Sequence, residues 1–157
     1  MMNTQILKIA GLIVITVTLL IGCGESSDSE KDSTDSQEEK QELTDFEMRN
    51  GIGPVDEEIT IDEIDPELAK EGMRIFDMKC GACHKLDSRY VGPPLGGVMN
   101  ARTPAYVMNM ILNPEEMLAK HPVAKSIGSE YPTRMTNQQL TREKARAVVE
   151  YLAQESQ

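Results

Sequence analysis

Two cysteines and a histidine stand close together near the middle of the chain, in the order Cys80-Gly81-Ala82-Cys83-His84. Two thiols and an imidazole at this spacing match the attachment site of a c-type haem. Each thiol can add to one vinyl group of the porphyrin, and the adjacent imidazole can ligate the iron from one face. The motif therefore predicts one covalent haem c, held by Cys80 and Cys83 and ligated by His84.

Two other readings of a Cys-x-x-Cys pair stay open, a redox dithiol and half of a four-ligand zinc site. A zinc site would need two further ligands, and the other candidates of that kind are Cys23 and His121. Cys23 fits a different role, described below, and a dithiol would leave His84 unexplained. Both readings are therefore weaker than haem.

The N-terminus has the features of a secretory signal, with Lys8 followed by an apolar run over residues 9–21. We expect residues 1–22 to be a signal peptide. The run is shorter than the roughly 20 apolar residues of a membrane-spanning helix. A retained membrane anchor is the alternative.

Leu20-Ile21-Gly22-Cys23 resembles the bacterial lipobox, in which the cysteine is lipidated and becomes the first residue of the mature protein. The resemblance implies lipidation at Cys23 and accounts for the odd cysteine. A cysteine with more than one acyl chain would anchor the protein stably. We therefore expect a bacterial membrane-anchored lipoprotein that faces the periplasm.

The net charge of −10 is unevenly distributed, because residues 24–64 hold 15 acidic and 3 basic side chains while residues 65–157 hold 11 and 12. Residues 23–45 are rich in Ser, Asp, Glu and Gln and have too few apolar groups to offset the entropy of ordering. We expect a lipidated cysteine followed by a disordered acidic linker over residues 23–45. The linker either lets the domain move between partners or is a plain spacer.

Apolar residues return between residues 46 and 64, and Asn50-Gly51 and Gly53-Pro54 predict turns there. This segment is expected to be an extension that packs on the domain.

Residues 65–157 are predicted to form one all-α domain. Three helix starts combine a capping residue with proline at the first helical position, and they are Asp65-Pro66, Thr103-Pro104 and Asn113-Pro114. A last helix is expected from about Thr141 to Gln154. It has one apolar face, formed by Ala145, Val148, Val149 and Leu152.

The first helix of the domain has a matching face that contains Leu68, Gly72, Ile75 and Phe76. A glycine inside a helix costs about 1 kcal/mol relative to alanine. We expect the first and last helices to cross closely at Gly72, with Phe76 against Tyr151 or Leu152. A merely tolerated glycine is the alternative.

The order of these parts resembles the class I monohaem cytochromes c. A Gly72/Phe76 helix leads into the cysteine motif, Gly92-Pro93-Pro94-Leu95-Gly96 follows, and Met135 precedes the last helix. The resemblance implies a small cytochrome c fold around one haem. It also implies that the carbonyl of Pro93 accepts a hydrogen bond from Nδ1 of His84, which fixes the tautomer that leaves Nε2 free for iron. Without that role, the segment would be an ordinary rigid loop.

The resemblance places the sixth iron ligand at Met135. Family members commonly have proline after this methionine, whereas this chain has Thr136. His121, another methionine or an open position are the alternatives. The remaining methionines are expected to fill core or surface, among them Met73, Met78, Met99, Met108, Met110 and Met117.

Two further predictions concern the surroundings of the haem. Arg102 and Tyr106 stand where related proteins hydrogen-bond a haem propionate, and a guanidinium suits a carboxylate. Basic residues also cluster in sequence around the haem segments, namely Lys79, Lys85, Arg89 and Arg134. They are expected either to steer an acidic partner or simply to be solvated.

His/Met ligation fills both axial sites and favours electron transfer over catalysis. We therefore expect a monomeric electron carrier between a quinol-oxidising complex and a terminal reductase or oxidase, with no nucleic-acid partner. Residues 50–55 together with the haem segment also resemble small cytochromes that accompany nitrous-oxide reductase.

Three other functions are weighed against the electron carrier. A haem-based gas-binding or sensor protein would need an open or labile sixth site. A cytochrome c peroxidase would need a second haem motif, which this chain lacks. A non-catalytic subunit of a larger complex would have the same sequence features as a free carrier.

Overall fold

The computed structural model describes residues 42–157. The predicted signal peptide, the lipidation site Cys23 and most of the predicted linker lie outside the described residues. Within residues 42–157 the protein is helical and has no strand, so the all-α prediction is confirmed. The helices are α1 (Asp45–Asn50), α2 (Pro66–Lys79), α3 (Val98–Ala101), α4 (Pro104–Leu112), α5 (Pro114–Lys120), α6 (Pro122–Ser129) and α7 (Arg142–Glu155).

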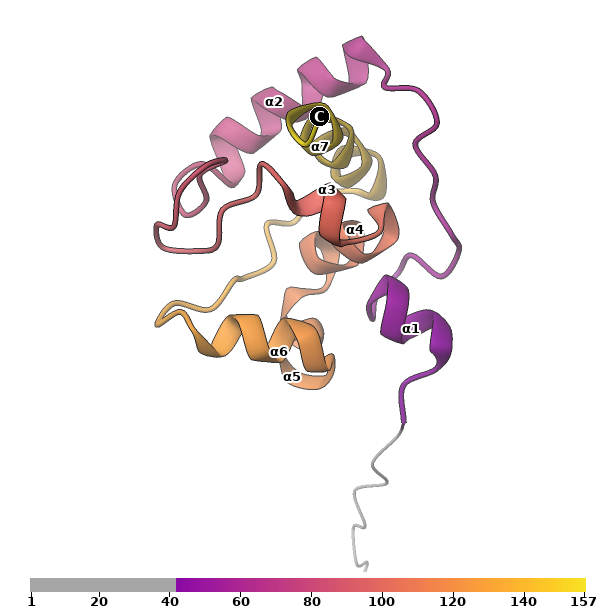
Figure 1. Ribbon diagram of the computed structural model, residues 1–157, viewed down its shortest axis with the longest axis vertical. Coiled ribbons are helices and arrows are strands. Elements are labelled where there is room, and N and C mark those ends of the chain that lie inside the picture. Colours follow the sequence, from indigo (N-terminus) through magenta and orange to yellow (C-terminus); the bar gives the residue numbers. More distant parts are fainter. Residues whose placement is uncertain (1–41) are drawn as a thin grey trace, which may run out of the picture. The chain divides into compact units, whose positions relative to one another are not determined.

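Among the described helices, α2 and α7 make the most extensive contact with each other, and they cross at one end of the domain (Figure 1). A Cβ placed on Gly72 would lie 1.9 Å from the carbonyl oxygen of Ala147, so only glycine permits this approach. The rings of Phe76 and Tyr151 pack with their centroids 5.4 Å apart. The predicted close crossing at Gly72 is therefore confirmed, and the predicted apolar face of α7 is buried.

Two of the predicted caps are present as expected. The Asp65 side chain accepts from the backbone of Glu67 and Leu68 at the start of α2, and the Thr103 side chain accepts from Tyr106 at the start of α4. The prediction for Asn113 is right about the start of α5 but wrong about the cap. Its side chain makes no capping bond there and instead donates to the carbonyl of Ile52 at 3.2 Å.

The segment before α2 is ordered from further upstream than the composition suggests. Helix α1 begins at Asp45, and a reciprocal capping box between Thr44 and Glu47 closes its first turn. Asp45, the last residue of the predicted linker, is thus the first residue of a helix. After α1, Ile52 and Val55 are buried in the core.

A buried amide on α4 fixes the chain that follows α1. Asn109 donates to the carbonyls of Asn50 and Val55, both at 2.9 Å, and accepts from the backbone N–H of Val55 at 2.9 Å. The backbone N–H of Ile52 donates to the sulfur of Met117 at 3.0 Å. These bonds attach the segment to α4 and α5.

Candidate haem-binding site

The cysteine motif forms a tight turn directly after α2. The backbone N–H of Cys80 still donates to Phe76, and those of Cys83 and His84 both donate to the carbonyl of Cys80 at 2.9 Å. This turn brings the two thiols and the imidazole together. Cys80 is buried, Cys83 is exposed, and no disulfide joins them.

Burial changes the acidity of one thiol. It raises the pKa of Cys80 to about 11, with a smaller contribution from the neighbouring Cys83. A raised pKa disfavours the thiolate, which is the form that acts as a redox nucleophile. Within residues 42–157, moreover, no three His, Cys, Asp or Glu side chains gather into a metal site. The zinc reading therefore has no ligand set in this part of the chain.

The imidazole of His84 is held in one orientation by the following loop. Its Nδ1 lies 2.9 Å from the carbonyl oxygen of Pro93, which can only accept, so Nδ1 carries the proton. The predicted bond is thus present. It leaves Nε2 unprotonated, with a lone pair that is free to ligate iron. Gly92 packs against the ring itself, because a Cβ there would lie 2.5 Å from Cε1 of His84.

The loop between α6 and α7 carries Met135, which is partly buried against the core. Asn137, two residues later, fixes this loop to the body of the domain. Its backbone N–H donates to the carboxylate of Glu115 at 3.0 Å, and its side chain donates to the carbonyl of Leu112 at 2.8 Å. Met135 is therefore presented by a loop that is anchored on its C-terminal side.

His121, the alternative sixth ligand, is completely buried and has partners at both ring nitrogens. Its Nε2 donates to the carbonyl of Met48 at 3.2 Å, and its Nδ1 accepts from the backbone N–H of Ala124, which caps α6. Its ring also packs edge-on against Tyr106. An imidazole engaged in this way has no lone pair left for iron.

Arg102 and Tyr106 lie together, with the guanidinium 5.4 Å from the centre of the phenol ring. Burial raises the pKa of Tyr106, and the charge of Arg102 partly opposes that effect. Both residues line a groove of about 440 Å³ that also contains Arg49. Two guanidinium groups in one groove suit a carboxylate. Arg49 was not predicted for this site, because it belongs to α1, 53 positions before Arg102 in the sequence.

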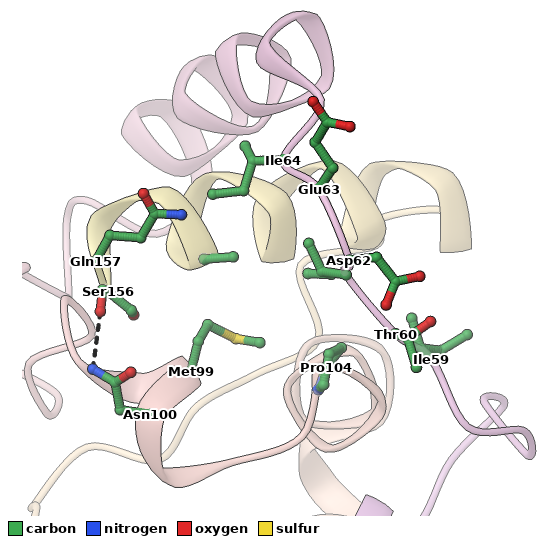
Figure 2. Close-up of a pocket in the computed structure, with 12 residues that line it drawn as sticks. Ile59, Thr60, Asp62, Glu63, Ile64, Met99, Asn100, Pro104, Ser156 and Gln157 are labelled. Atoms are coloured by element: carbon green, nitrogen blue, oxygen red, sulfur yellow. Dashed lines mark hydrogen bonds between the residues drawn. The ribbon is translucent and has the colours of Figure 1, made fainter.

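A second groove, of about 700 Å³, lies between residues 59–64, α3 and the end of α7 (Figure 2). Asn100 donates across it to the carbonyl of Ser156 at 3.0 Å. None of Cys80, Cys83 and His84 lines this groove. It is therefore separate from the site built around the cysteine motif.

The residues of the site fit a covalently attached haem. One turn supplies two thiols, and the histidine beside them has a fixed tautomer with Nε2 free. Residues 69–156 match the family described as Cytochrome c. Because this match covers more than half of the chain, the chain belongs to the cytochrome c family.

Solved structures agree with this assignment. Cytochrome c from Rhodothermus marinus is 44% identical in sequence, with a TM-score of 0.66, and the match covers 70% of this chain and 95% of that one. Two structures of one engineered variant of that cytochrome, Rma TDE, are 43% identical with TM-scores of 0.66 and 0.64, and each match covers 70% of this chain and 96% of the variant. In the second of these structures the variant is bound to a carbene intermediate. The search of curated proteins finds no match.

The fold and the family define a class I monohaem cytochrome c with one covalent haem c. It is an electron-transfer haem protein, as is general in this family. The haem supplies the one-electron chemistry, and the protein supplies its ligands and its insulation.

Proposed function

We propose that this cytochrome is a lipid-anchored carrier, facing the periplasm, that transfers single electrons through a haem ligated by His84 and Met135. The bond between His84 and Pro93 is the observation that carries the proposal, because it prepares Nε2 for iron on one side. Two observations favour Met135 for the other side. It lies in an anchored loop, and the ring nitrogens of His121 are both engaged.

His/Met ligation would raise the reduction potential and leave no site for a small molecule. This argues for a carrier over a gas-binding protein. Thr136, where family members commonly have proline, leaves the methionine loop without that rigid residue. The anchor of Asn137 on Glu115 and Leu112 takes over part of that role.

The membrane anchor is proposed at Cys23, by lipidation after removal of residues 1–22. Within residues 42–157 no helix is both long and apolar enough to cross a membrane. A Cys23→Ser variant should lose membrane retention and incorporation of labelled fatty acid, while its haem spectrum stays unchanged. Membrane retention of that variant would contradict the lipid anchor.

The charges around the haem segments suit an acidic partner. Lys79, Lys85 and Arg134 are exposed. The acidic segment over residues 56–67 runs on the other side of the helices from the loop that follows the cysteine motif (Figure 1). Such a separation of charge orients a diffusing protein before contact. Docking is therefore proposed through the haem side of the domain.

The proposed donor is a quinol-oxidising complex, and the proposed acceptor is a terminal reductase or oxidase. The resemblance of residues 50–55 favours nitrous-oxide reductase as the acceptor. A monomer is proposed, with no nucleic-acid partner. The test is to mix the ferrous holoprotein with nitrous-oxide reductase and nitrous oxide at rising salt, with and without carbon monoxide.

Oxidation that slows as salt rises and is unaffected by carbon monoxide would support the carrier and its docking side. A rate of oxidation that does not depend on salt would contradict the electrostatic docking but not the electron-carrier function. Rapid uptake of carbon monoxide by the ferrous protein would instead favour a gas-binding function.

A further inference from the structure

We propose that Arg89 is a positioning residue that latches the loop carrying Met135 to the loop carrying the carbonyl for His84. We call residues 85–96 the proximal loop and residues 130–136 the distal loop. The inference deepens the proposed function, because its consequence for the iron rests on Met135 being the sixth ligand. The latch itself is a contact between two loops and is independent of that assignment.

Arg89 reaches from the proximal loop to the start of the distal loop, 41 positions later in the sequence. Its guanidinium carbon lies 4.1 Å from the centre of the Tyr131 ring. The guanidinium also donates to the backbone carbonyl of Glu130 and lies 3.9 Å from the Glu130 carboxylate. The Arg89 side chain thus stacks on a ring, donates a hydrogen bond to a carbonyl and pairs with a carboxylate, all at two adjacent residues of the distal loop.

The proximal loop is a firm base for this contact. The backbone N–H of Gly92 donates to Cys83 at 2.8 Å, that of Leu95 donates to Lys85 at 2.9 Å, and that of Gly96 donates to Leu86 at 2.8 Å. These bonds connect the loop back to the cysteine turn. Arg89 is therefore held by the same backbone that orients His84.

The distal loop has few bonds of its own. Among the described residues, its backbone N–H groups from Thr133 to Thr136 donate to no other backbone group. At its C-terminal end the loop is followed by Asn137, which is anchored on Glu115 and Leu112. At its N-terminal end the contacts of Arg89 with Glu130 and Tyr131 form the second attachment. Met135 lies between the two.

The latch should limit how often the distal loop opens. The side chains of Arg89 and Glu130 are 57% and 59% exposed, so their ion pair is screened by water and salt. The stacking on Tyr131 and the bond to the backbone carbonyl do not depend on the carboxylate. Removing the guanidinium should therefore raise the open population of the loop by about three- to tenfold.

The experiment uses the ferric holoprotein and four variants, Arg89→Leu, Tyr131→Leu, the double variant and Arg74→Leu. Arg74 is an exposed arginine on α2 and serves as the matched control for loss of one surface charge. Loop opening is measured as the rate of trypsin cleavage after Arg134, detected by mass. Access to the iron is measured as the rate of imidazole binding. Cleavage reports the open population when opening is fast compared with cleavage.

We expect Arg89→Leu and Tyr131→Leu each to raise both rates by about three- to tenfold, with little further gain in the double variant. In Arg74→Leu, the rates of cleavage and of imidazole binding should both stay within about twofold of those of the wild type. Unchanged cleavage in Arg89→Leu would overturn the latch, whatever the sixth ligand is. If Arg89→Leu is cleaved faster but binds imidazole at the rate of the wild type, the proposed effect of the latch on access to the iron is wrong.

The optical spectrum of the wild type separates a failure of the latch from a failure of the proposed function. If the ferric protein shows no sign of thioether ligation, then Met135 is not the ligand and the proposed effect on the iron is wrong. In that case the cleavage rates still test whether Arg89 holds the two loops together.

Discussion

Gly92 lies against the imidazole ring of His84, and a Cβ at that position would be 2.5 Å from Cε1 and 2.9 Å from Nδ1. The next residue, Pro93, supplies the carbonyl that accepts from Nδ1. One short backbone segment therefore packs against the ring and also fixes its tautomer. The ligand is positioned by two consecutive residues of one loop.

Replacing Gly92 by alanine should disturb the iron ligand without removing it. The added methyl group would push the ring away from the Pro93 carbonyl and weaken the bond that holds Nδ1. We expect Gly92→Ala to shift the reduction potential and to lower the yield of protein with an intact low-spin haem, measured by redox titration and optical spectroscopy.

Gly97 provides a control for this variant, because a Cβ at Gly97 would meet no atom within 4 Å. Gly97→Ala should keep the potential of the wild type. The packing argument fails if Gly92→Ala has the potential and spectrum of the wild type as well.

Replacing Gly72 by alanine should destabilise the domain, because the new Cβ would meet the backbone carbonyl of Ala147 at 1.9 Å. Alanine gains about 1 kcal/mol of helix propensity over glycine, but overpacking typically costs about 1–3 kcal/mol and the clash here is with backbone. We expect a net loss of about 2 kcal/mol in the free energy of unfolding, measured by denaturation of the holoprotein. Equal stability of Gly72→Ala and wild type would show that α2 and α7 can separate without cost.

Replacing Asn109 by alanine should release the segment that follows α1. The carbonyls of Asn50 and Val55 and the N–H of Val55 would lose their buried partner. Unpaired buried groups cost about 1–3 kcal/mol each, so a loss of about 3 kcal/mol is expected. The exposed Asn100, which donates to Ser156 alone, serves as control, and Asn100→Ala should cost less than about 1 kcal/mol. A loss no larger than that of the control would contradict a holding role for Asn109.

The sequence was sufficient for the parts of the fold that depend on local pattern. The Asp65 and Thr103 caps, the crossing at Gly72 and the extent of α7 follow from residue spacing and helix chemistry, and the structure has them. The bond from His84 to Pro93 came from the family resemblance and is also present. These features each lie within one helix, one loop or one helix pair.

Features that depend on contacts between distant segments were not predicted. The side chain of Asn113 had the right type and position for a cap, but its amide oxygen accepts no capping bond. Its amide nitrogen instead donates to the carbonyl of Ile52, 61 positions earlier, and to the carboxylate of Glu116. The short helices α1, α3 and α6 were missed, although His121-Pro122 repeats the pattern of a polar residue before proline. Arg89 was predicted only as one of several surface charges. Its role depends on Tyr131, which the sequence does not place beside it.

The most direct test of His84/Met135 ligation is the optical spectrum of the ferric and ferrous holoprotein, with and without carbon monoxide, for wild type, Met135→Ala and the exposed control Met78→Ala. We expect a low-spin wild type with the weak far-red ferric band of thioether ligation and no binding of carbon monoxide. Met135→Ala should lose the band and bind carbon monoxide, while Met78→Ala should match the wild type. Persistence of the band in Met135→Ala, or rapid binding of carbon monoxide by the wild type, would contradict Met135 as the sixth ligand.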